Sequence, residues 1–109
     1  MSKFFKEIEE NMDVDFLAKL DIAREYANIP FNITSAYRSK EHPLSIKNPS
    51  SSHIKGLAVD ISTPNSRIRF KVLEALIKVG FKRIGVGHNF IHVDDDKDKS
   101  TEVMWDYYK

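Results

Sequence analysis

At 109 residues, the chain has the length of one domain with room for a single hydrophobic core. Hydrophobic residues make up 41% of it and charged residues 30%, which is typical of a soluble globular protein. The net charge of +1 gives no general basic field, so we expect no nucleic-acid partner. The absence of cysteine excludes disulfides, thiolate metal sites and cysteine nucleophiles. We therefore expect a single domain over residues 1–109 that works as a monomer.

The N-terminal stretch MSKFFKEIEENMD contains two phenylalanines but lacks the continuous apolar core of a secretory signal. No apolar run in the sequence approaches the length of a membrane span. We expect synthesis in the cytoplasm without a signal peptide and no membrane span. A target outside the cytoplasm would then need another means of delivery.

Helical and extended patterns alternate along the first half of the chain. From Asp13 to Asn28, apolar residues recur at three- and four-residue spacing, which predicts a helix that ends before Pro30. The segment IPFNITSAY, residues 29–37, changes to the pattern of a short strand after Pro30. Residues 38–52 contain two prolines and five serines with little periodicity, so we expect a long loop of the kind that often carries function.

The second half of the sequence predicts one more helix and several short strands. LAVDI has a strand composition, and TPNSRIRFKVLEALIKVG has a helical apolar stripe with Gly80 at its C-terminal cap. Three closing strands are predicted in FKRIGVGHN, FIHVD and EVMWDYY, with DDKDKS as a solvated turn between the last two. The predicted fold class is α+β, with two main helices packed on a small, largely antiparallel sheet.

Two of the predicted strands carry polar residues on one of their faces. In FIHVD, His92 and Asp94 share one face, and in LAVDI, Asp60 lies on the face opposite the larger aliphatic side chains. If these strands are neighbours, Asp60 and His92 can converge, and His53 can fold over them because Gly56 permits a tight turn. Two imidazoles and one carboxylate leave a coordination position open for water, as in catalytic zinc sites. Metal coordination would also offset the cost of placing a carboxylate in a partly buried cleft.

The stretch SSHIKGLAVDI has the pattern S-x-H-x-x-G-x-A-x-D and resembles the zinc D-Ala-D-Ala carboxypeptidase and L,D-peptidase family, which shares its fold with the hedgehog signalling domain. ITSAYRS resembles the strand of that family that ends in Tyr-Arg, and FIHVDDD resembles its closing H-x-D strand. The stretch from Gly80 to Tyr108 is similar to small phage and bacterial members. The resemblance covers nearly the whole chain and implies the hedgehog/DD-peptidase fold.

The resemblance implies a zinc metallopeptidase that hydrolyses an amide bond in peptidoglycan stem peptides or cross-links, as a cell-wall carboxypeptidase or endopeptidase or as a phage endolysin. It implies His53, Asp60 and His92 as the ligands of one Zn²⁺ ion. It also implies that Arg38 holds a substrate carbonyl or carboxylate and stabilises the oxyanion, and that Ser51 binds substrate or steadies its loop. The expected place of action is the cell wall or periplasm, after release or from a virion.

The sequence departs from this family where a general base is expected. Members usually carry Glu, Asp or His three residues before the last zinc histidine, but this chain has Asn89, which cannot accept a proton from water near neutral pH. Candidate substitutes are a residue of the acidic turn, His88, which alternation places on the face of His92, and Asp94, which can alternatively support His92. Asn89 favours the alternative of a non-catalytic zinc-containing domain that binds cell wall or a protein partner. A non-haem iron triad of His53, His92 and Asp94 is disfavoured by the ligand order and the short chain.

Overall fold

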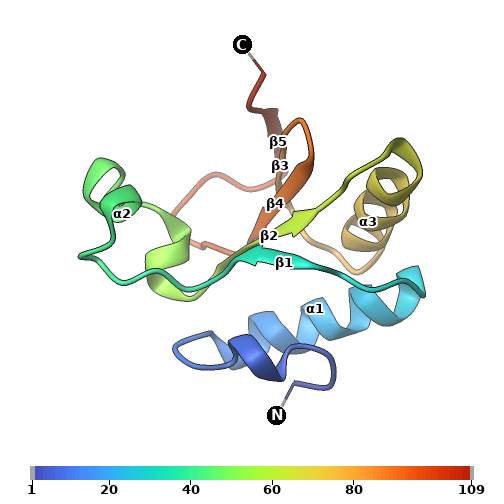
Figure 1. Ribbon diagram of the computed structural model, residues 1–109, viewed down its shortest axis with the longest axis horizontal. Coiled ribbons are helices and arrows are strands. Elements are labelled where there is room, and N and C mark those ends of the chain that lie inside the picture. Colours follow the sequence, from blue (N-terminus) through green and yellow to red (C-terminus); the bar gives the residue numbers. More distant parts are fainter. Residues whose placement is uncertain (1, 109) are drawn as a thin grey trace.

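The computed structural model describes residues 2–108, in which helices and strands alternate along the chain (Figure 1). The elements are the 3₁₀ turns η1 (Lys6–Ile8) and η2 (Ser52–Lys55), the helices α1 (Val14–Ala27), α2 (Pro43–Lys47) and α3 (Ser66–Lys78), and the strands β1 (Ile33–Ser35), β2 (Ala58–Ser62), β3 (Arg83–Val86), β4 (Phe90–Asp94) and β5 (Val103–Asp106). Within the described residues, the helices are all too short or too polar to cross a membrane.

The strands form a single sheet in the order β1-β2-β4-β3-β5 over the described residues. The β1–β2, β2–β4 and β4–β3 pairs are antiparallel, and β5 joins the edge of the sheet parallel to β3. The predicted α+β class and largely antiparallel sheet are confirmed. Because β4 is antiparallel to β3, β4 ends at the end of the sheet where β3 begins, and the segment after β4 passes this end to start β5 on the other side of β3.

Both long helices begin where a side chain caps the first turn. The Asp13 carboxylate accepts a hydrogen bond of 2.8 Å from the backbone N–H of Phe16, and the Asn65 side chain accepts one of 2.9 Å from the N–H of Ile68. Asn28 ends α1 in a left-handed conformation with φ of 56°. The predicted helices therefore form close to their predicted bounds.

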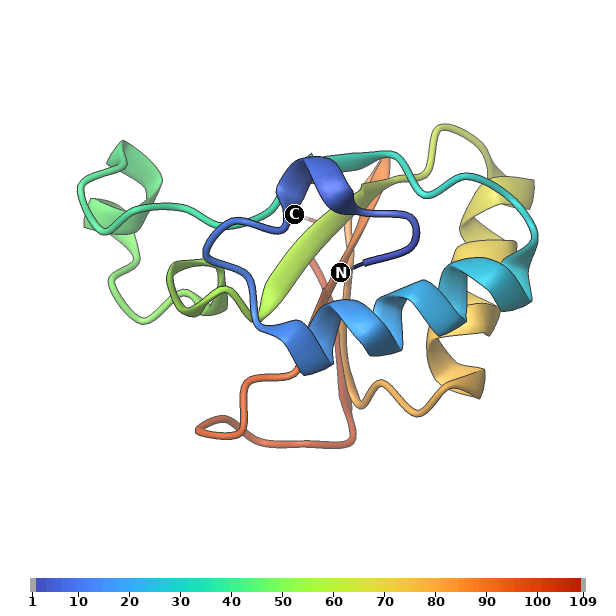
Figure 2. The ribbon, with the colours of Figure 1, turned by 90° about the horizontal axis from the view of Figure 1, so that it is seen from below.

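The hydrophobic core lies between the two long helices and one face of the sheet. Seen from below, α1 runs across this face with α3 beside it (Figure 2). The core-facing strand residues are fully buried aliphatics: Val59, Ile61, Ile91 and Val93. Because side chains alternate along a strand, the residues between them face the other side of the sheet, which is left for polar chemistry.

The segment predicted as a long loop, residues 38–52, contains a short helix. Pro43 occupies the first turn of α2, and a ring nitrogen of His42 accepts a hydrogen bond of 3.1 Å from the N–H of Leu44. The sequence did not predict this helix because five residues are too few to show an apolar period.

The turn from η2 into β2 requires a glycine. Gly56 has φ of +70°, and a Cβ at this position would lie 2.1 Å from the backbone oxygen of Asn11. The N-terminal segment therefore presses directly on this turn, and the tight turn predicted at Gly56 is present. The close approach fixes the position of η2, and thus of His53, relative to β2.

Candidate metal centre

The sheet register places the predicted site residues in one row on the polar face. Asp60 of β2 is paired with His92 of β4, His92 is paired with Gly85 of β3, and Gly85 is paired with Trp105 of β5. Directly paired residues point to the same face of a sheet. β2 and β4 are therefore neighbours, as the predicted convergence of Asp60 and His92 required.

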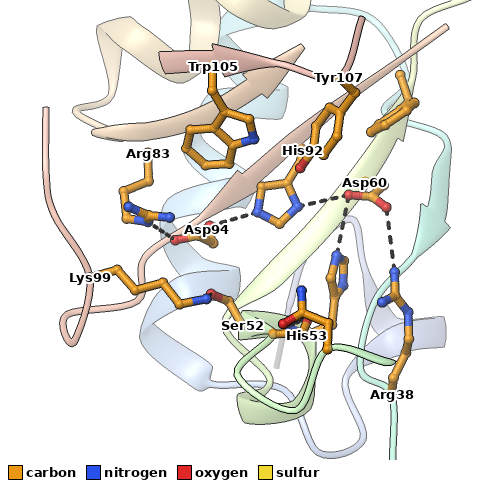
Figure 3. A pocket seen from close by; sticks show the side chains of 13 residues that line it. Arg38, Ser52, His53, Asp60, Arg83, His92, Asp94, Lys99, Trp105 and Tyr107 are labelled. Carbon is orange, nitrogen blue, oxygen red and sulfur yellow. Dashed lines mark hydrogen bonds and ion pairs between the residues drawn. The ribbon is translucent and has the colours of Figure 1, made fainter. Parts of the chain in front are cut away.

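His53, Asp60 and His92 converge at the base of a cleft, and each offers one potential ligand atom within 4.8 Å of the others (Figure 3). Asp60 Oδ1 lies 3.0 Å from His92 Nδ1 and 3.4 Å from His53 Nε2. His53 and His92 are buried, and the Asp60 side chain is 17% exposed. The structure thus brings together the three residues that were predicted as metal ligands.

The second nitrogen of each imidazole is held by the protein. His53 Nδ1 donates a hydrogen bond of 2.8 Å to the carbonyl oxygen of Ala36, which leaves Nε2 directed at the centre of the triad. His92 Nε2 lies 2.7 Å from Asp94 Oδ2, which leaves Nδ1 for the centre. Such partners orient metal-bound histidines and increase their basicity. Two nitrogen donors and one carboxylate, fixed in this way, fit a zinc ion.

Protons and a metal ion would compete for this site. Burial raises the pKa of Asp60, but hydrogen bonds from His53 and His92 outweigh burial and bring the pKa well below its usual value. Burial lowers the pKa of His92, but hydrogen bonds to Asp60 and Asp94 outweigh it and raise the pKa. A metal would have to displace the proton from His92 Nδ1, so metal binding is expected to weaken as the pH falls.

Asp94 lies on the far side of the His92 ring from Asp60. Its side chain is 1% exposed, and it accepts hydrogen bonds from Arg83 Nε at 2.6 Å and from the backbone N–H of Asp96 at 3.2 Å in addition to its contact with His92. Of the two roles considered for Asp94 from the sequence, this geometry supports the positioning of His92. Arg83 thus also acts on the site through Asp94, a link that the sequence did not indicate.

A cleft of about 380 Å³ opens above the triad. It is lined by Arg38, Asn48, Ser51, Ser52, His53, Asp60, Arg83, Phe90, His92, Asp94, Lys99, Trp105 and Tyr107. Its lining includes the basic side chains of Arg38, Arg83 and Lys99 and the carboxylates of Asp60 and Asp94, and Arg83 is paired with Asp94 at 2.6 Å.

The two residues predicted to bind substrate both border this cleft. Arg38 Nη2 lies 3.8 Å from Asp60 Oδ2, and its guanidinium donates hydrogen bonds of 2.9 and 3.1 Å to the Ser35 hydroxyl. The Ser51 hydroxyl accepts a hydrogen bond of 3.3 Å from the N–H of His53 and caps η2. Arg38 is thus held with its charge beside the triad, while Ser51 steadies the turn that carries His53.

His88 and Asn89 lie in the turn between β3 and β4 rather than on the strand. His88 is exposed and stacks on Tyr108 with 4.5 Å between ring centroids, and it does not line the cleft above the triad. The backbone oxygen of Asn89 accepts a hydrogen bond of 2.8 Å from the N–H of Thr63. The prediction that His88 shares a strand face with His92 is wrong, because β4 begins only at Phe90 and strand alternation does not reach His88.

The acidic segment after β4 is not simply a solvated turn. Asp96 is 1% exposed and accepts hydrogen bonds from Lys55 Nζ at 2.9 Å and from the Ser52 hydroxyl at 2.8 Å. Lys99 Nζ donates a further bond of 3.1 Å to the Ser52 hydroxyl. Burial raises the pKa of Asp96, but the hydrogen bonds from Lys55 and Ser52 outweigh burial and lower the pKa to about 2. This Asp96 cluster (Ser52, Lys55, Asp96 and Lys99) ties the segment to the turn that bears His53.

An aromatic wall, which the sequence did not assign to the site, closes one side of the cleft. Trp105 lies 5.7 Å from His92 between ring centroids, and the Arg83 guanidinium lies 5.0 Å from the Trp105 ring. Tyr107 follows it, with its ring 5.2 Å from that of Phe90. The signal that could have identified these residues is their alternate spacing in EVMWDYY, but only the β3–β5 pairing shows which face they occupy.

The His-Asp-His triad at the base of an open cleft is a candidate metal site of the kind that metal-dependent hydrolases use. The family model described as Peptidase M15 matches residues 2–94, and the chain belongs to this family. Membership implies the hedgehog/DD-peptidase fold that the sequence motifs predicted. No curated protein and no solved structure shows a significant match to the chain.

Proposed function

We propose that this protein is a zinc-dependent peptidase that hydrolyses an amide bond in peptidoglycan stem peptides or their cross-links. The observation that carries the proposal is the convergence of His53, Asp60 and His92 at the base of an open cleft, in a member of the Peptidase M15 family. A zinc ion held by these residues would lower the pKa of a bound water and polarise the scissile carbonyl.

Two cations that line the cleft, Arg38 and Lys99, support a peptide substrate that carries a carboxylate. A guanidinium can hold a carboxylate or carbonyl through two parallel hydrogen bonds. Arg38 is the better placed of the two, because Ser35 orients it and its own ion pair with Asp60 is long at 3.8 Å. We propose that Arg38 binds the substrate carbonyl or carboxylate next to the scissile bond.

The bond that is cleaved and the place of action are part of the same proposal. Cleavage of a D,D or an L,D bond would make the protein a cell-wall carboxypeptidase, an endopeptidase or an endolysin. In each case it would act on the cell wall or in the periplasm, after release or from a virion. The masses of the released fragments would distinguish these bonds.

The test is incubation of the zinc-loaded protein with purified muropeptides, followed by mass spectrometry. We expect cleaved fragments from the wild type and none from the isosteric variant Asp60→Asn. Chelation should stop the reaction, and added zinc should restore it. If the zinc-bound wild type gives no fragment between mildly acidic and mildly basic pH, the peptidase proposal is wrong.

The alternative is a non-catalytic zinc-containing domain that binds cell wall or a protein partner. It is favoured by Asn89, and by the fact that both carboxylates lining the cleft above the triad, Asp60 and Asp94, are hydrogen-bonded to His92 within the described residues. This alternative predicts that muropeptides bind to the zinc-loaded protein but remain uncut. Calorimetry measures muropeptide binding and mass spectrometry measures cleavage, so together they separate the two functions.

A further inference from the structure

We propose that the Tyr107 hydroxyl donates a hydrogen bond to the scissile carbonyl oxygen as that oxygen gains negative charge during hydrolysis. This inference rests on the proposed peptidase function and deepens it by adding a catalytic residue. Tyr107 lies beyond residues 2–94, the part of the chain that the Peptidase M15 model matches. The argument for it comes from the position of the side chain in the cleft.

The backbone places Tyr107 at the edge of the cleft. Its N–H donates a hydrogen bond of 3.0 Å to the carbonyl oxygen of Val86, which extends the β3–β5 pairing one step beyond Asp106. The ring packs between Phe90, at 5.2 Å, and Trp105, at 6.4 Å between centroids. In Figure 3 the Tyr107 ring descends over the cleft, with its hydroxyl end toward His92.

A glycine in the row of site residues makes this approach possible. Gly85 is paired with His92, and a Cβ at position 85 would lie 2.8 Å from Tyr107 Cε2 and 2.6 Å from Trp105 Nε1. Any larger residue would therefore push both rings away from the sheet. The absence of a side chain at Gly85 lets Tyr107 reach over the strand that bears His92.

The chemistry of a phenol suits one role and excludes another. A phenol has an ordinary pKa of about 10, so the hydroxyl is protonated near neutral pH. It can donate a hydrogen bond, but it cannot take a proton from water, so it does not replace the base missing at Asn89. Tyr107 and Arg38 reach the triad from opposite sides of the cleft in Figure 3, so the two can contact one substrate from both sides.

The first experiment compares Tyr107→Phe with Tyr108→Phe in muropeptide hydrolysis. The Tyr108 hydroxyl contacts Arg69 Nη1 at 2.9 Å and the carbonyl oxygen of Gly87 at 3.3 Å, away from the cleft, so its loss is a matched control. We expect Tyr107→Phe to lower kcat about 100-fold, with KM and zinc affinity unchanged. The control should keep the wild-type kcat. An unchanged kcat in Tyr107→Phe, or a loss that appears only in KM, overturns the inference.

A second experiment requires no turnover. Calorimetry measures the binding of two ligands, a phosphinate peptide that mimics the tetrahedral anion and its parent peptide. Each ligand is titrated into both chelator-treated and zinc-loaded protein. For the zinc-loaded protein, we expect Tyr107→Phe to weaken phosphinate binding about 100-fold and to leave parent-peptide binding unchanged. Equal losses for both ligands, or no loss for either, overturn the inference. If the wild type binds the phosphinate in a Tyr107-dependent way but cuts no muropeptide, the peptidoglycan substrate is wrong, while the role of Tyr107 as donor to a tetrahedral anion stands.

Discussion

Two carboxylates on either side of η2, those of Asp60 and Asp96, have opposite surroundings. The Asp96 carboxylate is 1% exposed and has a lysine ammonium at 2.9 Å and a serine hydroxyl at 2.8 Å. The Asp60 carboxylate is 17% exposed, its nearest neighbours are two imidazoles, and its guanidinium partner is 3.8 Å away. Asp96 therefore has a lysine countercharge in direct contact, whereas Asp60 has two imidazoles, which can also bind a metal, and a more distant guanidinium.

The difference shows how one short turn can serve both stability and chemistry. A buried carboxylate with a close cation is already satisfied and holds segments together. A carboxylate that shares an open cleft with two imidazoles still has room for a metal ion. Ser52 and Lys55 of η2 point to Asp96, and His53 points to Asp60. The structural cluster thus positions one of the predicted metal ligands.

The largest effect should come from removing the carboxylate of the triad. Asp60→Asn takes away an anionic donor, so we expect zinc binding to be lost and hydrolysis to fall to background. Zinc content after dialysis and competition with a chromophoric chelator measure this loss. Asp95→Asn, with the same charge change outside the cleft, should bind zinc normally. Tight zinc binding by Asp60→Asn would contradict the assigned ligand set.

Removing the partner of His92 should have a smaller effect. Asp94→Asn leaves the three ligands in place but weakens the hydrogen bond that orients His92, so we expect zinc affinity to fall about 10- to 100-fold. Competition with the same chelator measures the affinity, and hydrolysis is measured at saturating zinc. Turnover should then largely recover. Loss of turnover at saturating zinc with unchanged affinity would instead make Asp94 the general base.

The Asp96 cluster should affect stability rather than turnover. The folded-state pKa of Asp96 is about 2, below its ordinary value of 3.8, so its stabilising effect is present above about pH 4 and is lost as the pH falls toward 2. We expect Asp96→Asn to lower the unfolding free energy of the metal-free protein by about 2 kcal/mol at pH 7. Urea unfolding at several pH values measures this. The difference in unfolding free energy between wild type and variant should disappear between pH 4 and 2. A difference that does not change with pH would contradict the assigned contacts of Asp96 with Lys55 and Ser52.

The smallest effect is expected at the exposed turn. His88→Ala should change the unfolding free energy by less than about 0.5 kcal/mol and leave zinc affinity and turnover near the wild-type values. His88 stacks on Tyr108 and does not line the cleft above the triad, so it is poorly placed to move a proton there. Muropeptide hydrolysis as a function of pH checks this. A large loss of turnover would identify His88 as the base that the sequence pattern proposed.

The sequence was sufficient to predict the α+β class, both long helices and the convergence of three candidate ligands. Helical spacing and strand alternation are local properties, so they show which side of an element faces the core. That is why Asp60 and His92 could be placed on the polar face. The S-x-H-x-x-G-x-A-x-D pattern added His53, and its glycine occupies the left-handed turn at Gly56 that brings η2 against the triad.

Only the tertiary structure decided what surrounds the triad. The burial of Asp96 depends on Ser52, which is 44 positions away in the sequence, and no local pattern reports such a contact. Trp105 and Tyr107 line the cleft because β5 pairs in parallel with β3 beside Gly85. Local periodicity shows which side chains share a face, but strand order and register decide which faces and loops meet, and these depend on the packing of the whole chain.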